Sequence, residues 1–68
     1  MAGVYKKIEI VGTSKESFAD ATRAAIVEAS KSVKNLSWFE VDEMRGAIRD
    51  GQVSEFQVTV RIGFKVEH

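Results

Sequence analysis

The dipeptide Asp50-Gly51 is the feature that most limits the folds this chain can adopt, because it separates two long runs in which apolar and polar residues alternate. Asp-Gly is a strong signal for a two-residue type I′ β-hairpin loop, in which both residues adopt a positive φ. The sequence therefore predicts a hairpin formed by residues 38–49 and 53–66. A three-residue loop would shift the pairing by one residue and turn every side chain of one strand to the other face.

The two-residue loop also predicts which residues face each other across the hairpin, because paired residue numbers then have a constant sum. Trp38 is expected opposite Gly63, and Met44 opposite Gln57. Cross-strand partners point to the same face of a sheet. The only tryptophan of the chain is therefore expected on the same face as Gln57.

The second strand of the hairpin has one apolar face and one polar face. Its apolar face is predicted to carry Phe56, Val58, Val60, Ile62, Phe64 and Val66. The same register places Arg45 on the apolar face, where an unpaired arginine is costly. We expect Arg45 to reach solvent, a carboxylate of another subunit or a ligand phosphate.

The segment before the hairpin indicates one further strand and one helix. Residues 4–11 are rich in branched side chains and predict a strand, and a helical apolar stripe predicts a helix over about 15–34. Thr13 to Glu16 has the spacing of a capping box, and Asn35 is expected to close the helix. The order is β-α-β-β, an α+β fold with a three-stranded antiparallel sheet packed on one helix.

Length and composition limit the classes of function. A length of 68 residues predicts a single domain, residues 1–68. The chain has ten basic and ten acidic side chains, no cysteine and one histidine, His68. Balanced charge argues against nucleic-acid binding, and no apolar run approaches the ~20 residues that cross a bilayer. The expectation is a cytoplasmic protein. One helix cannot cover a hairpin of roughly 40 Å, so a second copy is expected to cover the remainder.

Trp38 beside Gln57 on a polar face indicates a ligand-binding surface, with ordinary core or interface packing as the alternative. Glu40, Asp42 and Glu43 could suggest a divalent metal site, although alternating acids on an exposed strand are usually only solvated. The strand-to-helix turn at 11–14 lacks the spacing of a phosphate-binding P-loop. Without an internal histidine or cysteine, and without a serine beside a recognisable base, the chain is predicted to bind rather than to catalyse.

Several segments, taken in order and at comparable spacing, resemble the dodecin family. They are Val4-Tyr-Lys-Lys-Ile-Glu-Ile-Val-Gly-Thr-Ser14, Trp38-Phe-Glu-Val41, Arg45-Gly46, Phe56-Gln-Val58 and Gly63-Phe-Lys-Val-Glu67. This resemblance covers essentially the whole chain. It implies a small β-α-β-β protein that assembles into a hollow homododecamer and binds stacked pairs of flavins between tryptophans of adjacent subunits.

The resemblance also implies roles for individual residues. Trp38 would stack on the flavin, Gln57 would bond the polar edge of its ring, and Arg45 would contact the ligand or its phosphate. FMN is the expected flavin, with riboflavin or FAD as alternatives, and the implied function is flavin storage, buffering or photoprotection. Some members also bind coenzyme A, a ligand to which the sequence assigns no residues. A cofactor-free assembly module, a coenzyme A-binding assembly and a flavin-dependent enzyme remain the alternatives.

Overall fold

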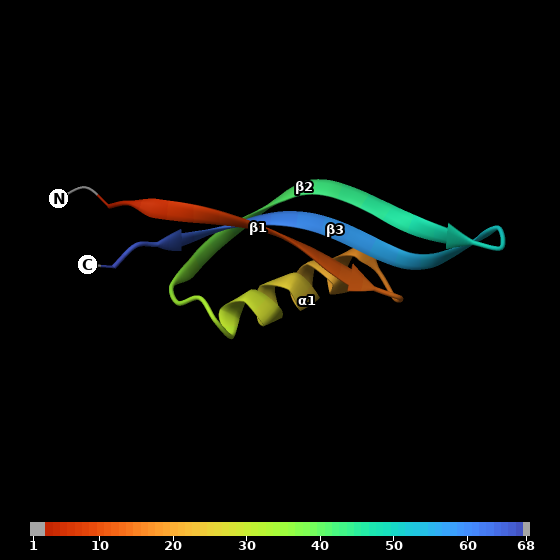
Figure 1. Ribbon diagram of the computed structural model, residues 1–68, viewed down its shortest axis with the longest axis horizontal. Helices are drawn as coiled ribbons and strands as arrows, with labels where there is room; N and C mark the ends of the chain where they lie inside the picture. The colour runs from red at the N-terminus through yellow and green to blue at the C-terminus, as the bar shows by residue number, and fades with distance from the viewer. Residues whose placement is uncertain (1–2, 68) are drawn as a thin grey trace.

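A computed structural model describes residues 3–67, so that His68 lies outside the described residues. The elements are β1 (Tyr5–Ser14), α1 (Phe18–Ser30), β2 (Leu36–Arg49) and β3 (Gln52–Lys65). The strands form one antiparallel sheet in the order β1-β3-β2, and α1 packs on one face of it (Figure 1). The predicted β-α-β-β order and α+β class are confirmed. Within residues 3–67, the 13-residue α1 is not long and apolar enough to span a membrane.

The hairpin turn has the predicted conformation. Asp50 has φ 53° and Gly51 has φ 75°, as a type I′ turn requires, and Arg49 pairs with Gln52. The two-residue loop is therefore confirmed. It forms the far end of the molecule, opposite the end at which both termini lie (Figure 1).

Gly51→Ala should lower the free energy of unfolding by about 1 kcal/mol, because a side chain at positive φ is strained. A Cβ at Gly51 would meet no atom within 4 Å. The loss of stability in Gly51→Ala would therefore report backbone strain alone, without a steric clash. Asp50→Asn is the matched control, since asparagine tolerates positive φ. Chemical denaturation at equal protein concentration measures both variants. Equal midpoints for Gly51→Ala and Asp50→Asn would contradict the prediction.

The pairing along the hairpin is interrupted at three places. One leaves Ser37 as an extra residue on β2, between Leu36 and Trp38, and the other two compensate each other. Near the turn, Ala47 pairs with Glu55 and Ile48 with Val53, which leaves Ser54 as an extra residue on β3. Farther along, Val41 pairs with Val60 and Glu43 with Thr59, which leaves Asp42 as an extra residue on β2. The second insertion cancels the first, and Trp38 therefore faces Gly63 as predicted.

Between the extra residues Asp42 and Ser54, each of which forms a β-bulge, the predicted register is wrong by one residue. Met44 pairs with Val58, and Arg45 pairs with Gln57. A one-residue shift moves a side chain to the opposite face of a sheet. Arg45 therefore lies on the same face as Gln57, and the prediction that it lies on the apolar face is wrong.

The helix begins three residues later than predicted, because β1 continues to Ser14 and takes up the first half of the expected capping box. Thr13 and Ser14 still pair with β3, so that the chain leaves the sheet only after them. The helix is capped instead by Ser17, whose hydroxyl accepts a hydrogen bond from the Asp20 backbone N–H at 3.0 Å.

The helix also ends earlier than predicted, at Ser30 rather than near residue 34. At the C-cap, the backbone N–H of Lys31 donates to the carbonyl of Glu28 at 3.2 Å, and the N–H of Ser32 donates to the carbonyl of Ala29 at 3.2 Å. Asn35 lies beyond this end, with φ 66°, and leads the chain into β2. It therefore turns the connection and does not close the helix.

The core lies between α1 and the central strand β3. Its buried apolar residues are Ala21, Ala25 and Ala29 of α1 and Val58, Val60 and Ile62 of β3. Alanine lets the helix lie very close to the sheet. A Cβ built on Gly12 of β1 would lie 2.0 Å from the carbonyl oxygen of Ala21, so that only glycine fits there.

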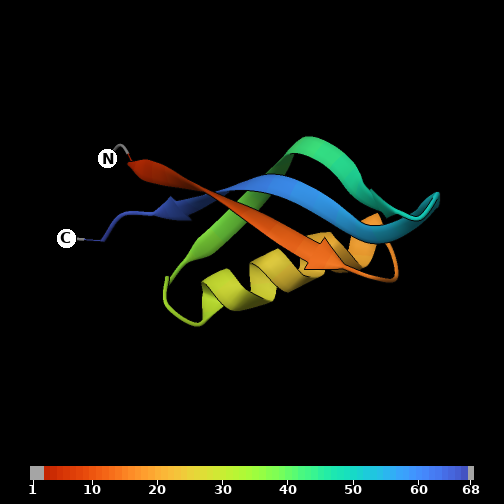
Figure 2. The ribbon, with the colours of Figure 1, turned by 45° about the vertical axis from the view of Figure 1, so that its right-hand side comes forward.

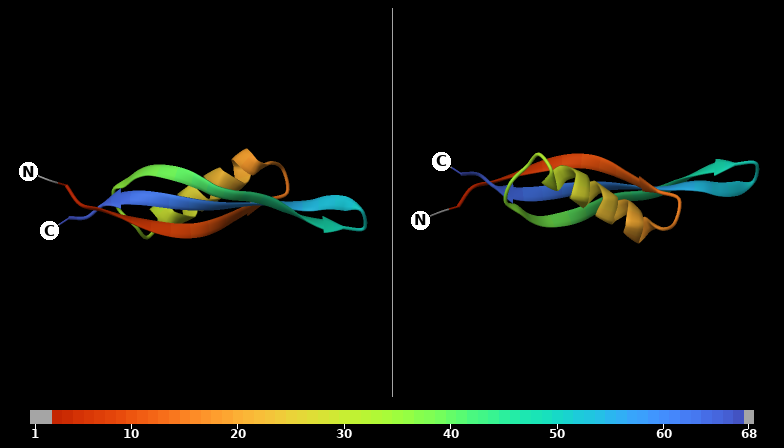
Figure 3. Two further views of the ribbon diagram at one scale, coloured as in Figure 1. Left: turned by 90° about the horizontal axis from the view of Figure 1, so that it is seen from above. Right: turned by 90° about the horizontal axis from the view of Figure 1, so that it is seen from below.

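The single helix leaves much of the sheet uncovered. It packs on β1 and β3 but scarcely contacts β2, and the hairpin extends well beyond it (Figures 2 and 3). The molecule is accordingly elongated, with extents of 54 × 20 × 13 Å. The expectation that one helix cannot cover the hairpin is confirmed.

Candidate ligand-binding face

The face of the sheet opposite α1, hereafter the open face, carries the residues that the sequence singled out. Its side chains form rows across the three strands, because β3 pairs with β1 on one side and with β2 on the other. From β1 through β3 to β2, the rows are Lys7–Gly63–Trp38, Glu9–Arg61–Glu40, Val11–Thr59–Glu43 and Thr13–Gln57–Arg45.

The indole of Trp38 lies flat over Gly63. A Cβ built on Gly63 would lie 2.3, 2.4 and 2.5 Å from three adjacent ring atoms of Trp38. Nearly equal distances to adjacent atoms mean that Gly63 faces the plane of the ring and not its edge. Tyr5 packs beside the indole, with ring centroids 5.3 Å apart and planes inclined by 58°. Trp38 remains 40% exposed, and we infer that the outer face of its ring is free.

The polar edge of the indole is held by Glu40. The Nε1–H of Trp38 donates a hydrogen bond to Oε2 of Glu40 at 2.9 Å, and Nζ of Lys7 lies 2.8 Å from the same oxygen. The hydrogen bonds from Lys7 and Trp38, with the charge of Arg61 nearby, lower the pKa of Glu40 below its ordinary value of 4.5. Glu40 is therefore an ionised acceptor at neutral pH.

The acids of β2 that suggested a metal site are each held by a different cation. The pairs are Glu40–Lys7 at 2.8 Å, Glu43–Arg45 at 2.6 Å and Asp42–Arg61 at 3.5 Å. These carboxylates do not converge on one point, and residues 3–67 hold no group of three histidine, cysteine or acidic side chains arranged to bind a metal ion.

Arg45 and Gln57 form the second polar cluster of the open face. Nε of Arg45 donates to Oε1 of Gln57 at 2.6 Å, and its Nη1 donates to Glu43 at 2.6 Å. Nε2 of Gln57 donates to Glu55 at 2.9 Å. A glutamine amide offers two lone pairs and two N–H groups. Gln57 therefore keeps one acceptor site and one donor for a further partner.

Trp38 and Gln57 lie on the same face, as predicted, but not next to each other. Trp38 pairs with Gly63 of β3, and Gln57 lies on the same strand six positions before Gly63. Six positions correspond to about 20 Å along a strand. The structure thus brings Arg45 to Gln57 and leaves Trp38 at the other end of the face.

Sequence reasoning missed two contacts. The Arg45–Gln57 pair was not predicted, because it depends on β-bulges that have no distinctive local sequence pattern. The Trp38–Glu40 contact had a usable signal, because residues two apart on a strand share a face.

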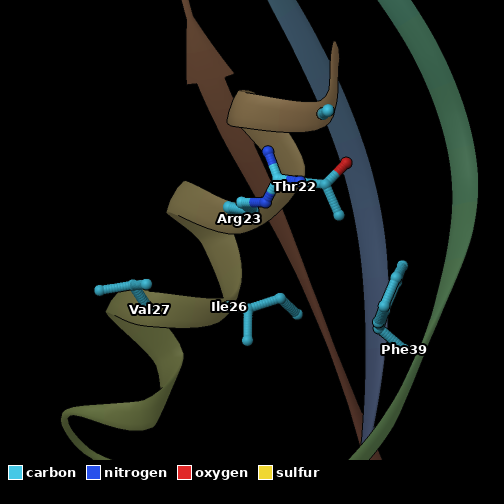
Figure 4. Close-up of a pocket in the computed structure, with 6 residues that line it drawn as sticks. Thr22, Arg23, Ile26, Val27 and Phe39 are labelled. Atoms are coloured by element: carbon cyan, nitrogen blue, oxygen red, sulfur yellow. The ribbon is translucent and has the colours of Figure 1, made fainter. Parts of the chain in front are cut away.

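An apolar groove lies on the other face of the sheet, between α1 and β2. Its volume is about 550 Å³, and its walls include Thr22, Ile26 and Val27 of α1 and Phe39 of β2. Figure 4 shows Thr22 and Ile26 extending from the helix toward the strands, with Phe39 opposite. Phe39 is 52% exposed, an unusual state for a phenylalanine in a lone folded chain.

Comparison with known proteins agrees with this architecture over the whole chain. The family model described as Dodecin matches residues 4–67. The chain belongs to the dodecin family. Dodecin from Thermus thermophilus is 48% identical over 67 residues, which are 98% of this chain and 97% of that protein.

Solved dodecin structures superpose closely on this dodecin-family chain. Dodecin from Streptomyces davaonensis matches with a TM-score of 0.95 and 43% identity, and the match covers 100% of both chains. Dodecin from Streptomyces coelicolor matches with a TM-score of 0.94 and 42% identity, over 97% of this chain and 94% of that one. Membership places the chain among small, self-assembling proteins and confirms the fold.

Proposed function

We propose that this dodecin-family chain forms a homododecamer that binds FMN in stacked pairs between the Trp38 indoles of adjacent subunits. The observation that carries the proposal is the indole of Trp38, which lies flat over Gly63 and remains 40% exposed. The bound flavin is held without turnover, so that the protein stores, buffers and photoprotects flavin in the cytoplasm.

Stacking on an indole suits the chemistry of a flavin. Isoalloxazine is a flat, electron-poor ring system, and an indole is electron-rich. Aromatic pairs contribute about 0.5–1.5 kcal/mol beyond the burial of their area. Gly63 supports the inner face of the ring, and a flavin would cover the outer face and remove it from water.

The separation between Trp38 and Gln57 favours a site made by two subunits. About 20 Å of strand separates the two positions, which is more than a three-ring flavin can bridge. A flavin stacked on Trp38 of one subunit therefore needs Gln57 of another. The free acceptor and donor of the Gln57 amide match the imide N–H and carbonyl of the flavin pyrimidine ring.

Self-assembly is favoured by the apolar surface that the single chain leaves open. The groove beside Phe39 and the exposed Val41 and Met44 of β2 have no cover within the described chain. Contiguous apolar surface of this kind commonly marks a protein interface. Static light scattering should give a particle twelve times the mass of the 7.5 kDa chain.

Arg45 is assigned a supporting role toward the ligand. Its guanidinium orients Gln57 through the 2.6 Å hydrogen bond, and its charge is balanced by Glu43. A flavin phosphate that reaches Arg45 would displace Glu43 from it. Riboflavin and FAD remain alternative flavins to FMN, and coenzyme A is a further ligand for which no contact residues are assigned.

The test is a fluorescence titration of the flavin-free protein with FMN, and with riboflavin and FAD in parallel. Flavin and tryptophan emission should be quenched together and saturate near one flavin per subunit. If flavin and tryptophan emission stayed unquenched at micromolar protein, the result would contradict flavin storage and favour an assembly module without a flavin. Turnover of bound flavin with a reductant would contradict the non-catalytic assignment.

Gln57→Ala should weaken FMN binding by about 1–3 kcal/mol, because the buried polar edge of the flavin would lose its hydrogen-bond partner. Gln52→Ala is the matched control, since Gln52 lies exposed beside the hairpin turn. Both affinities come from the same titration. An equal FMN affinity for the two variants would remove Gln57 from the site.

A further inference from the structure

The orientation of the Trp38 indole depends on few contacts. Gly63 lies beneath the ring and supplies no side chain to confine it, and Tyr5 packs beside it. The second side-chain torsion of tryptophan is broad and weakly restricted by itself. The hydrogen bond from Nε1–H to Glu40 at 2.9 Å is the contact that distinguishes the present ring orientation from a flipped one.

Glu40 is itself held by Lys7 of β1 and Trp38 of β2, and the charge of Arg61 of β3 lies nearby. Lys7 of β1 lies 2.8 Å from the oxygen that accepts the indole N–H, and Arg61 of β3 is the cross-strand partner of Glu40. The acceptor oxygen therefore has a defined position, and the carboxylate to which it belongs is ionised. Charge-assisted hydrogen bonds are shorter and stronger than neutral ones.

We propose that Glu40 is a positioning residue, whose carboxylate holds the Trp38 indole flat over Gly63 with its outer face ready for a planar, electron-poor ligand. A carboxylate on the N–H also makes the indole more electron-rich, which strengthens stacking on such a ligand. The ligand part of this inference rests on the proposed flavin function, whereas the orientation of the indole does not.

The chain offers a direct readout of the indole, because Trp38 is its only tryptophan. In the flavin-free oligomer, Glu40→Ala should shift the emission maximum and lower the anisotropy of Trp38. Glu40→Gln keeps an acceptor for the N–H without the charge and should restore much of the wild-type signal. Glu9→Ala is the matched control, since Glu9 bonds Arg61 from the other edge of the same row and does not hold the indole.

In the FMN titration, Glu40→Ala should raise the dissociation constant about tenfold and Glu40→Gln about threefold, with Glu9→Ala near wild type. An unchanged Trp38 signal in flavin-free Glu40→Ala, or the same change in Glu9→Ala, would overturn the positioning role. A changed signal with unchanged FMN affinity would overturn the link to the ligand. If the wild-type protein bound no flavin, the proposed function would fail, and the flavin-free emission would still decide the positioning role.

Discussion

Trp38→Ala is expected to weaken FMN binding about hundredfold. The substitution removes the ring that would cover one face of the flavin. A tryptophan has roughly 150–250 Å² of surface, of which the exposed 40% of Trp38 is available for stacking. At about 25 cal/mol per Å², together with the aromatic contribution, this amounts to about 3 kcal/mol. The fluorescence titration measures the affinity through flavin emission, since the variant has no tryptophan.

Trp38→Phe is the graded control for this loss, because it keeps an aromatic ring without the N–H that bonds Glu40. Its affinity should lie between those of the wild type and Trp38→Ala. The oligomer should persist in both variants, because Trp38 lies on the open face and not in the groove beside Phe39. Dissociation of Trp38→Ala in light scattering would instead show that the indole holds the assembly together.

Gly12→Ala is expected to lower the free energy of unfolding by about 3 kcal/mol. The new Cβ would lie 2.0 Å from the backbone oxygen of Ala21 and 2.9 Å from Cβ of Ala25. Neither atom belongs to a flexible side chain, so the whole helix has to move away from β1. That movement opens the alanine-lined contact on which this small core depends. Chemical denaturation at equal protein concentration measures the effect.

Gly3→Ala is the matched control, because its Cβ would lie 3.6 Å from the Tyr5 ring, an ordinary contact distance. Its denaturation midpoint should stay at the wild-type value. A wild-type midpoint for Gly12→Ala as well would show that α1 can withdraw from the sheet at little cost, and the close packing would then not limit stability.

The candidate site illustrates which contacts a sequence can predict. Opposite residues follow from the turn alone on a regular hairpin, and the predicted pairing of Trp38 with Gly63 holds here because two insertions between the turn and Trp38 cancel. The neighbour of Gln57 was not predictable in the same way, because Ser54 and Asp42 enter as bulges without a distinctive local pattern. The two insertions cancel, so the predicted register is right from Trp38 to Val41 and beside the turn, and wrong between them.

The sequence by itself determined the strand order along the chain, the type I′ turn at Asp50-Gly51 and the apolar face of β3, because each depends on local conformation or on a strict alternation. Tertiary structure alone decided the ends of α1 and the face of Arg45. Pairing with β3 keeps Thr13 in the sheet although its local spacing favours a helix cap, and the compensating bulges turn Arg45 to Gln57. Both outcomes follow from hydrogen bonding to a distant strand, which local preferences do not contain.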